Sequence, residues 1–348
     1  MPFRHMMDEP GMGLWPTLLA GSQGAGDEGL DVSEDQLALL DDLIGPVLSR
    51  HLLYNSGLNL ADREASQSRL MNRFRRADGL RWALDAANHG FEIVCLKGMA
   101  ATHFLYSSVD LRTMADADLL VRKTDCDRLV RHYQAAGLDF HDGLPDSRWG
   151  HIADASLIPL TGSDGASNVD LHIHPDAWPL HLGLSTEDVF AAATWVKTGE
   201  GRILVPSMTH MLLLSASHAA RDLFGPSTAK SLIDAARLLA QFGGQVDWTE
   251  FEARARRGRM LKPACAFLAI LDHLGADTRA VPRHLKHPPA GGEFRRALHD
   301  YVTLFAKDRS AFGKARREWL LCAEPGVALR RNLKRLIGLF RPHRGLRG

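Results

Sequence analysis

The first part of the chain carries hydrophobic residues at the three- and four-residue spacing of amphipathic helices. Between Leu37 and Leu48 aliphatic side chains recur at this period. Ser33, ahead of them, can cap a helix while Gln36 reaches back to it from the third helical position. Pro46 is expected to kink or divide this helix, because proline cannot donate a backbone hydrogen bond within it.

A longer helix, rich in Arg and Ala, is predicted from Glu64 to Asn88. His89-Gly90 follows it, and glycine readily adopts the left-handed conformation that ends helices. Residues 31–90 are therefore expected to form a helical segment. The stretch before them is rich in Gly and Met and lacks periodicity, which predicts a mobile tail over residues 1–30.

After residue 90 the pattern changes to short apolar runs and two-residue alternation, which are typical of strands. The predicted strands are Phe91 to Leu96, Asp116 to Val121, His151 to Leu160 and Asn168 to His174, with a turn from Thr161 to Ser167. One helix is expected directly after Lys97-Gly98, and a second is expected to open at Thr124 and end at Gly137. This pattern predicts a mixed α/β domain over residues 91–205.

From residue 206 onward helical periodicity replaces the strand pattern. The predicted helices begin with one that Ser207 caps and that runs through His218, followed by Ser227 to Phe242, Trp248 to Arg257 and Met260 to Leu274. We expect a helical domain over residues 206–282 and a helical extension with a basic tail over residues 283–348. The fold class expected for the whole chain is α+β, a small mixed sheet with an N-terminal helical segment and a C-terminal helical bundle.

The composition of the chain bears on its partners, on the state of its cysteines and on its location. The 348 residues include 42 basic and 41 acidic ones, so no overall charge points to a nucleic-acid partner. The four cysteines form no Cys-x-x-Cys pair, which fits reduced thiols better than a disulfide framework or a zinc knuckle. Neither a transmembrane stretch nor a signal peptide is recognisable, and a cytoplasmic location is expected.

Three aspartates are the main candidates for chemistry. Asp116 and Asp118 alternate in a predicted strand, which places both carboxylates on one face, roughly 7 Å apart along the chain. Asp170 shares one face of another predicted strand with His172 and His174. Carboxylates that converge on one point favour a hard divalent cation, Mg²⁺ or Mn²⁺, and metal-bound carboxylates of this kind support phosphoryl and nucleotidyl transfer.

Alternative interpretations remain open for each of these residues. Asp-x-Asp also occurs in solvated loops, and a strand histidine such as His172 is more often a buried hydrogen-bonded residue than a ligand. His174 precedes Pro175 at the strand end and is expected to be structural. The His-x-His pair with nearby aspartates also suits a zinc or manganese hydrolase, although further ligands at convincing spacing are missing.

In its motifs the chain resembles the uncharacterised nucleotidyltransferase family of the DNA polymerase β-like superfamily. The resemblance covers residues 35–282. It rests on Leu96-Lys97-Gly98, Tyr106, Arg112, Asp116-Ala117-Asp118-Leu119-Leu120-Val121 and Val169-Asp170-Leu171-His172, and continues through His218, Lys230 and Asp234.

This resemblance implies a nucleoside triphosphate bound through Mg²⁺ or Mn²⁺, and transfer of a nucleoside monophosphate to an unidentified acceptor hydroxyl or phosphate. Asp116 and Asp118 would be paired metal ligands and Asp170 the third acid. The Lys97-Gly98 turn stands where the superfamily has Gly-Ser or Gly-Gly, at a helix start whose N–H groups suit phosphate. A catalytically degenerate binding or scaffold module is the alternative from another class.

Four further residues belong to the same motifs. Arg112 can neutralise phosphate charge or pair with a carboxylate. Lys230 and Asp234 are four residues apart, which favours an ordinary helix-surface ion pair over contact with a nucleotide or acceptor. His218 can contact a nucleotide or acceptor in the same way.

The C-terminus predicts a basic amphipathic helix. Seven Arg or Lys residues and no acid lie between Leu329 and Gly348, and Leu329, Leu333 and Phe340 fall at helical spacing. Such a helix can contact an anionic membrane, a nucleic acid or an acidic partner, or it can dock on the protein with its charges in water.

Overall fold

The structure is a computed structural model that describes residues 18–19, 33–54, 63–141, 155–157, 159–163, 167–287, 291–302 and 310–340. The tail expected over residues 1–30 lies outside these residues, apart from Leu18 and Leu19. Within the described parts of the chain, no helix has the length and apolar character needed to cross a membrane.

The N-terminal segment is helical, as its periodicity predicts. Helix α2 (Glu34–Ile44) starts with a reciprocal capping box, in which the Gln36 N–H donates to Ser33 Oγ (3.3 Å) and the Ser33 N–H donates to Gln36 Oε1 (3.1 Å). Pro46 divides the predicted helix and begins α3 (Pro46–Tyr54). Helix α4 (Arg63–Asn88) ends ahead of Gly90, whose φ of +77° gives the expected left-handed turn.

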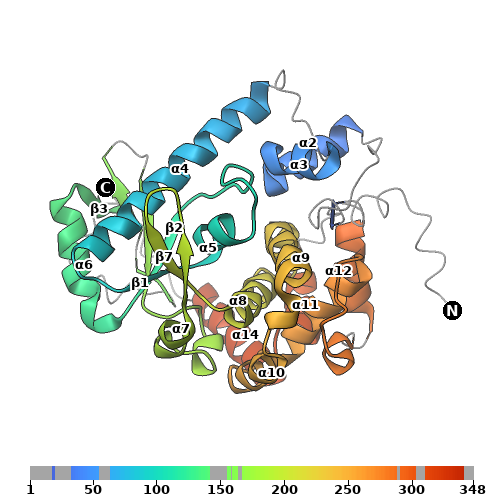
Figure 1. The fold of residues 1–348 in the computed structure, drawn as a ribbon. Helices are drawn as coiled ribbons and strands as arrows, with labels where there is room; N and C mark the ends of the chain where they lie inside the picture. The colour runs from blue at the N-terminus through green and yellow to red at the C-terminus, as the bar shows by residue number, and fades with distance from the viewer. Residues whose placement is uncertain are drawn as a thin grey trace.

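Within the described ranges, one seven-stranded mixed sheet lies beside these helices (Figure 1). Its order is β3-β4-β5-β2-β1-β7-β6, with β1 (Ile93–Cys95), β2 (Ala117–Val121), β3 (Leu138–Phe140), β4 (Leu160–Gly162), β5 (Asn168–His172), β6 (Thr194–Lys197) and β7 (Arg202–Val205). The pairs β2/β5 and β1/β7 are parallel, and the other neighbours are antiparallel. All five residues of β2 are buried, so helices must cover both of its faces.

Helices between the strands complete the α/β part. They are α5 (Lys97–Phe104), α6 (Lys123–Ala135) and α7 (Thr186–Ala192). Helix α4 crosses the sheet and contacts β1, β2, β5 and β7 (Figure 1). The predicted cap at Thr124 is wrong: α6 starts one residue earlier, and its cap position, Arg122, makes no side-chain cap hydrogen bond.

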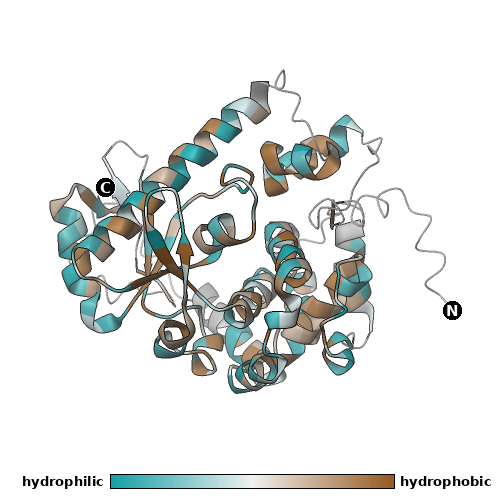
Figure 2. Ribbon diagram, viewed as in Figure 1, coloured by the Kyte–Doolittle hydropathy of each residue, from teal (hydrophilic) through white to brown (hydrophobic). Residues whose placement is uncertain are grey.

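The second half of the chain is helical and continues the same core. Its main helices are α8 (Met208–Arg221), α9 (Ala229–Phe242), α10 (Trp248–Arg257), α11 (Leu261–His273), α12 (Gly292–Val302), α13 (Ala311–Arg317) and α14 (Pro325–Phe340). Buried residues from α2, the sheet and helices α8 to α12 form one continuous hydrophobic cluster. In Figure 2 hydrophobic colour concentrates on the strands, while α4 and α6 carry hydrophilic colour along their length. The α+β fold class with flanking helical segments is confirmed.

The basic C-terminal helix exists and its first turns are docked. Val327 and Ala328 of α14 are buried in a small cluster with Trp178. The Arg330 guanidinium lies 4.3 Å from the centroid of the Trp178 ring system, and Arg331 donates to the Trp178 carbonyl (3.1 Å). Residues 341–348, with three of the seven predicted cations, lie outside the described residues. An anionic surface contact by this helix stays a prediction.

Candidate active site

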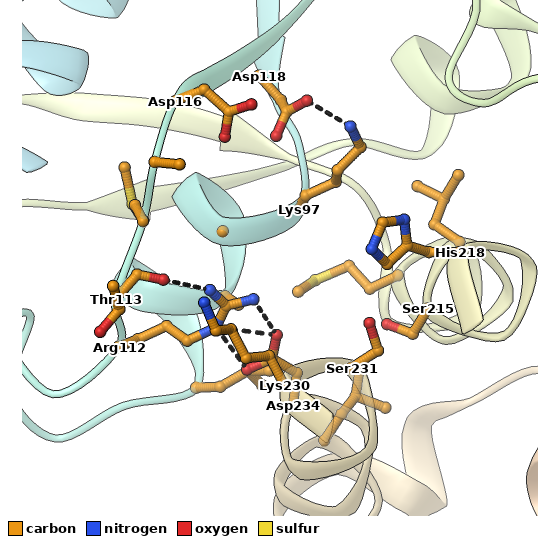
Figure 3. Close-up of a pocket in the computed structure, with 18 of the residues that line it drawn as sticks. Lys97, Arg112, Thr113, Asp116, Asp118, Ser215, His218, Lys230, Ser231 and Asp234 are labelled. Carbon is orange, nitrogen blue, oxygen red and sulfur yellow. Dashed lines mark hydrogen bonds and ion pairs between the residues drawn. The ribbon is translucent and has the colours of Figure 1, made fainter. Parts of the chain in front are cut away.

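The parallel pairing of β2 with β5 brings two acids side by side. In this register the Cα of Asp118 lies opposite that of Asp170, because aliphatic neighbours on both strands fill the core in step. Asp116 lies one residue before β2 rather than within it, and its carboxylate points with that of Asp118 toward the same cavity (Figure 3). The three acids predicted from sequence therefore gather at one end of the two strands.

Asp118 is the most strongly held of these acids. Its Oδ1 accepts hydrogen bonds from Lys97 Nζ (2.5 Å) and His172 Nε2 (2.7 Å), and its side chain is 4% exposed. Burial would raise the pKa of Asp118, but Lys97 and His172 outweigh burial and hold this pKa well below its usual range. Asp118 is therefore ionised at neutral pH.

His172 joins the two strands electrostatically. Its Nε2 also lies 3.3 Å from Asp170 Oδ2, so one imidazole faces two carboxylates. Burial lowers the pKa of His172, yet the hydrogen bonds to Asp118 and Asp170 outweigh burial and raise this pKa to about 9. His172 is thus the buried, hydrogen-bonded histidine that is usual on strands, and it carries positive charge among the acids.

Asp116 and Asp170 also keep carboxylate oxygens that Lys97 and His172 do not contact. Asp170 Oδ1 is buried without a hydrogen-bond partner. Asp116 has no hydrogen bond among the described residues, and burial followed by repulsion from Asp118 raises its pKa to about 6. An unsatisfied buried carboxylate oxygen is costly unless a ligand completes it. Asp118 and Asp170 therefore fit a hard divalent cation by donor type and by the unpaired oxygen of Asp170. With His172 they form a group whose ligand atoms lie within 4.8 Å of one another, and Asp116 lies outside that group.

The Lys97-Gly98 turn lies directly beside these acids. Lys97 adopts a left-handed φ of +42°, uncommon for a residue with a side chain, at the point where β1 leads into α5. A Cβ on Gly98 would lie 3.1 Å from Met114 Cγ, so only glycine fits this approach without displacement. No side chain caps the start of α5, and its first backbone N–H groups remain available to an anion.

Helices α8 and α9 form the opposite wall of a cavity of about 250 Å³ (Figure 3). Their polar contributions are Ser215, His218, Lys230, Ser231 and Asp234. Burial, with Arg112 as the next cause, lowers the pKa of Lys230 from its ordinary value. The two serines were not predicted from sequence, since a serine that faces a cavity has the same helical spacing as one that faces solvent.

Arg112 and Asp234 form a buried ion pair that crosses between the two walls. Arg112 Nη2 lies 2.8 Å from Asp234 Oδ2, and the Tyr106 hydroxyl donates to Asp234 Oδ1 (2.6 Å). Arg112 also donates through Nη1 to the Thr113 carbonyl (2.6 Å). The predicted surface pair between Lys230 and Asp234 is wrong, because Asp234 is buried and turns toward Arg112. Of the two roles open to Arg112, the structure places it with a carboxylate.

The two remaining histidines do not join the acids. His218 lines the cavity, and its ring lies 3.0 Å from Arg221 Nη2 through Nδ1. Burial lowers the pKa of His218. His174 stacks on His181 with centroids 4.7 Å apart. Among the described residues, the cluster around Asp118 includes His172 but not His174, which removes the basis for a His-x-His hydrolase.

Comparison with known proteins places these motifs in one family. Residues 61–276 match the family model described as uncharacterised nucleotidyltransferase. No curated protein matches the chain. Among solved structures, it is similar to an antigenic nucleotidyltransferase-like protein from Paracoccidioides brasiliensis, with 13% identity, coverage of 58% of this chain and 92% of that chain, and a TM-score of 0.35.

Proposed function

Because the chain belongs to the uncharacterised nucleotidyltransferase family, we propose that it transfers a nucleoside monophosphate from a nucleoside triphosphate to an acceptor hydroxyl or phosphate in a reaction that depends on Mg²⁺ or Mn²⁺. The acceptor oxygen forms a bond to the α-phosphorus, the bond between that phosphorus and the bridging oxygen breaks, and pyrophosphate leaves.

The observation that carries this proposal is that Asp116 and Asp118 face one cavity while Asp170 lies opposite Asp118 on the neighbouring strand, with its Oδ1 buried and unpaired. These three carboxylates would hold the divalent cation, which when bound would neutralise charge on the triphosphate. Asp118 is held in place by Lys97 and His172, so its oxygens are fixed before substrate binds. Such preorganisation is the main contribution that a protein makes to this chemistry.

Residues around the acids supply the triphosphate contacts in this proposal. The α5 start at Lys97-Gly98 offers backbone N–H groups to phosphate oxygens, and the Lys97 ammonium adds positive charge next to them. Lys230 on the opposite wall contributes a second cation to the cavity. Arg112 and Asp234 act by holding the walls together through their buried pair, with Arg112 close enough to the cavity to add to its positive field.

Proton transfer is assigned to Asp170. Its unpaired Oδ1 can accept the proton of the acceptor hydroxyl as the new bond forms. Its other oxygen remains near His172 Nε2, at 3.3 Å, which fixes the orientation of the carboxyl group. Asp170 is therefore proposed both to hold the cation and to take up this proton.

The test measures triphosphate binding and pyrophosphate release by the full chain. Calorimetry with each of the four nucleoside triphosphates, with and without Mg²⁺, identifies the donor. A metabolite library with a pyrophosphate-coupled assay then identifies the acceptor. We expect Mg²⁺-dependent binding in the wild type, and at least about a thousandfold loss of turnover in Asp116→Asn, because asparagine keeps the shape but removes the ligand charge.

Asp125→Asn is the matched control, since Asp125 lies on the surface in the first turn of α6, paired with Arg128. It should retain full activity. Undiminished turnover in Asp116→Asn with an intact circular dichroism spectrum would contradict the proposal. If the wild type binds no nucleotide with either metal, the degenerate binding module becomes the better description.

A further inference from the structure

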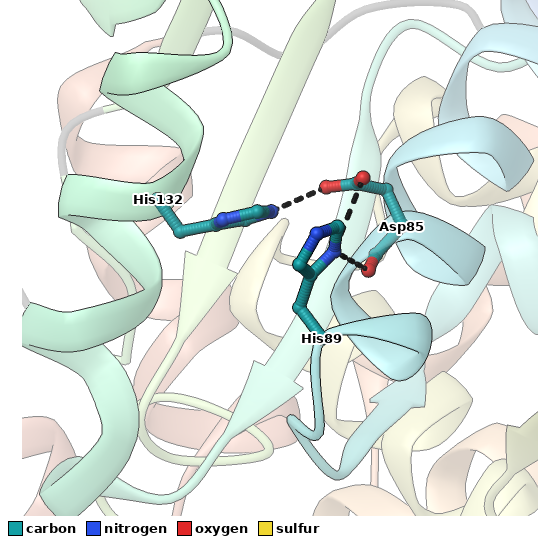
Figure 4. A group of neighbouring side chains, drawn as sticks. All are labelled: Asp85, His89 and His132. Carbon is teal, nitrogen blue, oxygen red and sulfur yellow. Dashed lines mark hydrogen bonds and ion pairs between the residues drawn. The ribbon is translucent and has the colours of Figure 1, made fainter.

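A second cluster of metal-binding side chains lies where α4 meets α6 (Figure 4). His132 Nε2 of α6 lies 2.6 Å from Asp85 Oδ2 of α4, and His89 Nδ1, directly after α4, lies 3.4 Å from Asp85 Oδ1. One nitrogen from each ring and one Asp85 oxygen all lie within 4.8 Å of one another. None of these three residues lines the cavity of the candidate active site.

The donor set matches a transition-metal ion rather than magnesium. Two imidazoles and one carboxylate are the ligands that zinc takes in sites that leave one position for water, whereas magnesium prefers oxygen alone. In a tetrahedral zinc site the ligand atoms are about 3.3 Å apart, given metal–ligand distances of about 2.0 Å. His132 Nε2 lies 2.6 Å from Asp85 Oδ2, which is a hydrogen-bond distance, so these two side chains must move apart by several tenths of an ångström to admit the ion. His89 Nδ1 lies 3.4 Å from the other carboxylate oxygen and 2.9 Å from the Asp85 backbone carbonyl, so the His89 ring must turn away from that carbonyl to bind through Nδ1.

The two ligand-bearing segments are held together by the core beneath them. Tyr133, next to His132, is fully buried and donates from its hydroxyl to the Trp82 carbonyl (2.8 Å), three residues before Asp85. The rings of Trp82 and Tyr133 also pack edge to face at 5.1 Å. His132 is therefore fixed opposite Asp85 without a metal, which lowers the entropy lost on binding.

The end of α4 adds a favourable field and an open route. The last carbonyls of a helix carry partial negative charge, which favours a cation near its C-terminus. The His89 and His132 rings lie 4.3 Å apart beside a single carboxylate. The side chains of His89, Asp85 and His132 are 54%, 31% and 23% exposed, so an ion can reach them from solvent.

We propose that Asp85, His89 and His132 form a zinc site that ties the C-terminal end of α4 to α6. Its role is structural, because the cluster lies outside the catalytic cavity and joins two surface helices of the α/β part. The inference is independent of the transferase activity, and a failure of either leaves the other standing.

The experiment titrates zinc into the full chain, with any affinity tag removed and metals stripped by a chelator. An Asp118→Asn background weakens metal binding at the acid cluster of the active site. Competition with a chromophoric chelator measures the dissociation constant, and Co²⁺ in place of zinc reports tetrahedral geometry through its visible absorption. We expect one equivalent bound at micromolar concentration or tighter.

Variants then assign the ligands. His132→Gln and His89→Ala should weaken zinc binding at least about a hundredfold, more than the loss of a residue that only orients a ligand. His89→Cys should retain binding with an altered Co²⁺ spectrum, because a thiolate replaces one imidazole. His284→Ala is the matched control: His284 is an exposed histidine paired with one carboxylate, Glu252 (2.9 Å), and its removal should change nothing.

Two results would overturn the proposal. One is the absence of bound zinc at micromolar concentration in the Asp118→Asn background. The other is zinc binding that survives both His89→Ala and His132→Gln unchanged, because the ion would then lie elsewhere. His89 is mostly exposed, so His89→Ala should fold, and thermal unfolding of each variant verifies this before titration.

Discussion

The part of the chain that the structure describes contains two clusters of aspartate and histidine, which differ in ligand type and in burial. In the cluster of the candidate active site, Asp118 and Asp170 surround a single histidine, His172, and the side chains are 4–15% exposed. In the cluster at the end of α4, two histidines surround Asp85, and the side chains are 23–54% exposed. The first is a buried group of acids with added cations, and the second is an open pair of imidazoles around one acid.

This difference shows how ligand type and burial together determine which metal ion each cluster suits. Carboxylates in a cavity create a strong negative field, which suits a hard cation and a phosphate substrate but needs Lys97 and His172 for balance. Imidazoles on a surface need no such balance, because they bind as neutral ligands. We therefore expect metal binding at the candidate active site to depend on the charges of its side chains, and the stability that the α4 cluster adds to depend on bound zinc.

The largest expected contrast is in catalysis. Asp170→Asn should reduce pyrophosphate release at least about a thousandfold, since it removes a ligand charge and the proton acceptor together. Asp85→Asn should change release less than twofold, because Asp85 does not line the cavity. Steady-state assays at saturating Mg²⁺ measure both. A large loss of turnover in Asp85→Asn would show that both clusters are needed for activity, against the prediction.

The next contrast is in stability without metal. Asp118→Asn should lower the free energy of unfolding by about 2–4 kcal/mol, because it leaves the partners Lys97 and His172 without their shared carboxylate. Asp85→Asn should lower it by less than about 1 kcal/mol, as is usual for partly exposed pairs. Urea unfolding in the presence of a chelator gives both values. Equal losses of unfolding free energy in the two variants would show that burial does not determine how much each carboxylate contributes to stability.

A smaller effect is expected from Lys97→Met, which removes a cation that balances the acids. Without the ammonium 2.5 Å from Asp118, the cluster becomes more negative, and Mn²⁺ in the absence of nucleotide should bind about tenfold more tightly. Triphosphate should bind about tenfold more weakly, because a phosphate contact is lost. Electron paramagnetic resonance and calorimetry measure the two affinities. Weakened binding of both ligands would mean that Lys97 only supports the fold.

That Asp118, Asp170 and His172 lie close together could largely be predicted from sequence, because strands impose a simple rule. Alternation places Asp170 and His172 on one face of β5, and the aliphatic neighbours of Asp118 indicate a buried strand. The same rule could not show that the Lys97 ammonium turns back onto Asp118, since that contact depends on the left-handed turn after β1.

Side-chain contacts between a helix and a distant part of the chain were not predictable in this way. Asp234 was assigned to Lys230 by its spacing, but it pairs with Arg112, 122 residues away. His132 and Asp85 are 47 residues apart on different helices. A polar residue on a helix follows the same period whether it faces water or a neighbouring helix, so only the packing of α4 on α6 reveals the second cluster. The hairpin of β6 and β7 was likewise not predicted as strands, although it lies within the α/β region expected from sequence.

The smallest expected effect tests whether the α4 cluster stabilises the protein only when zinc is bound. In the presence of a chelator, His89→Ala should change the free energy of unfolding by less than about 0.5 kcal/mol, because the ring is 54% exposed and its contacts are polar. With zinc above its dissociation constant, the wild type should gain stability that the variant lacks, since an ion bound only to the folded state stabilises it. Urea unfolding in both conditions separates the two cases. A loss above about 1.5 kcal/mol without metal would instead make the cluster a hydrogen-bonded brace between helices, and the contrast between the two clusters would then be one of burial alone.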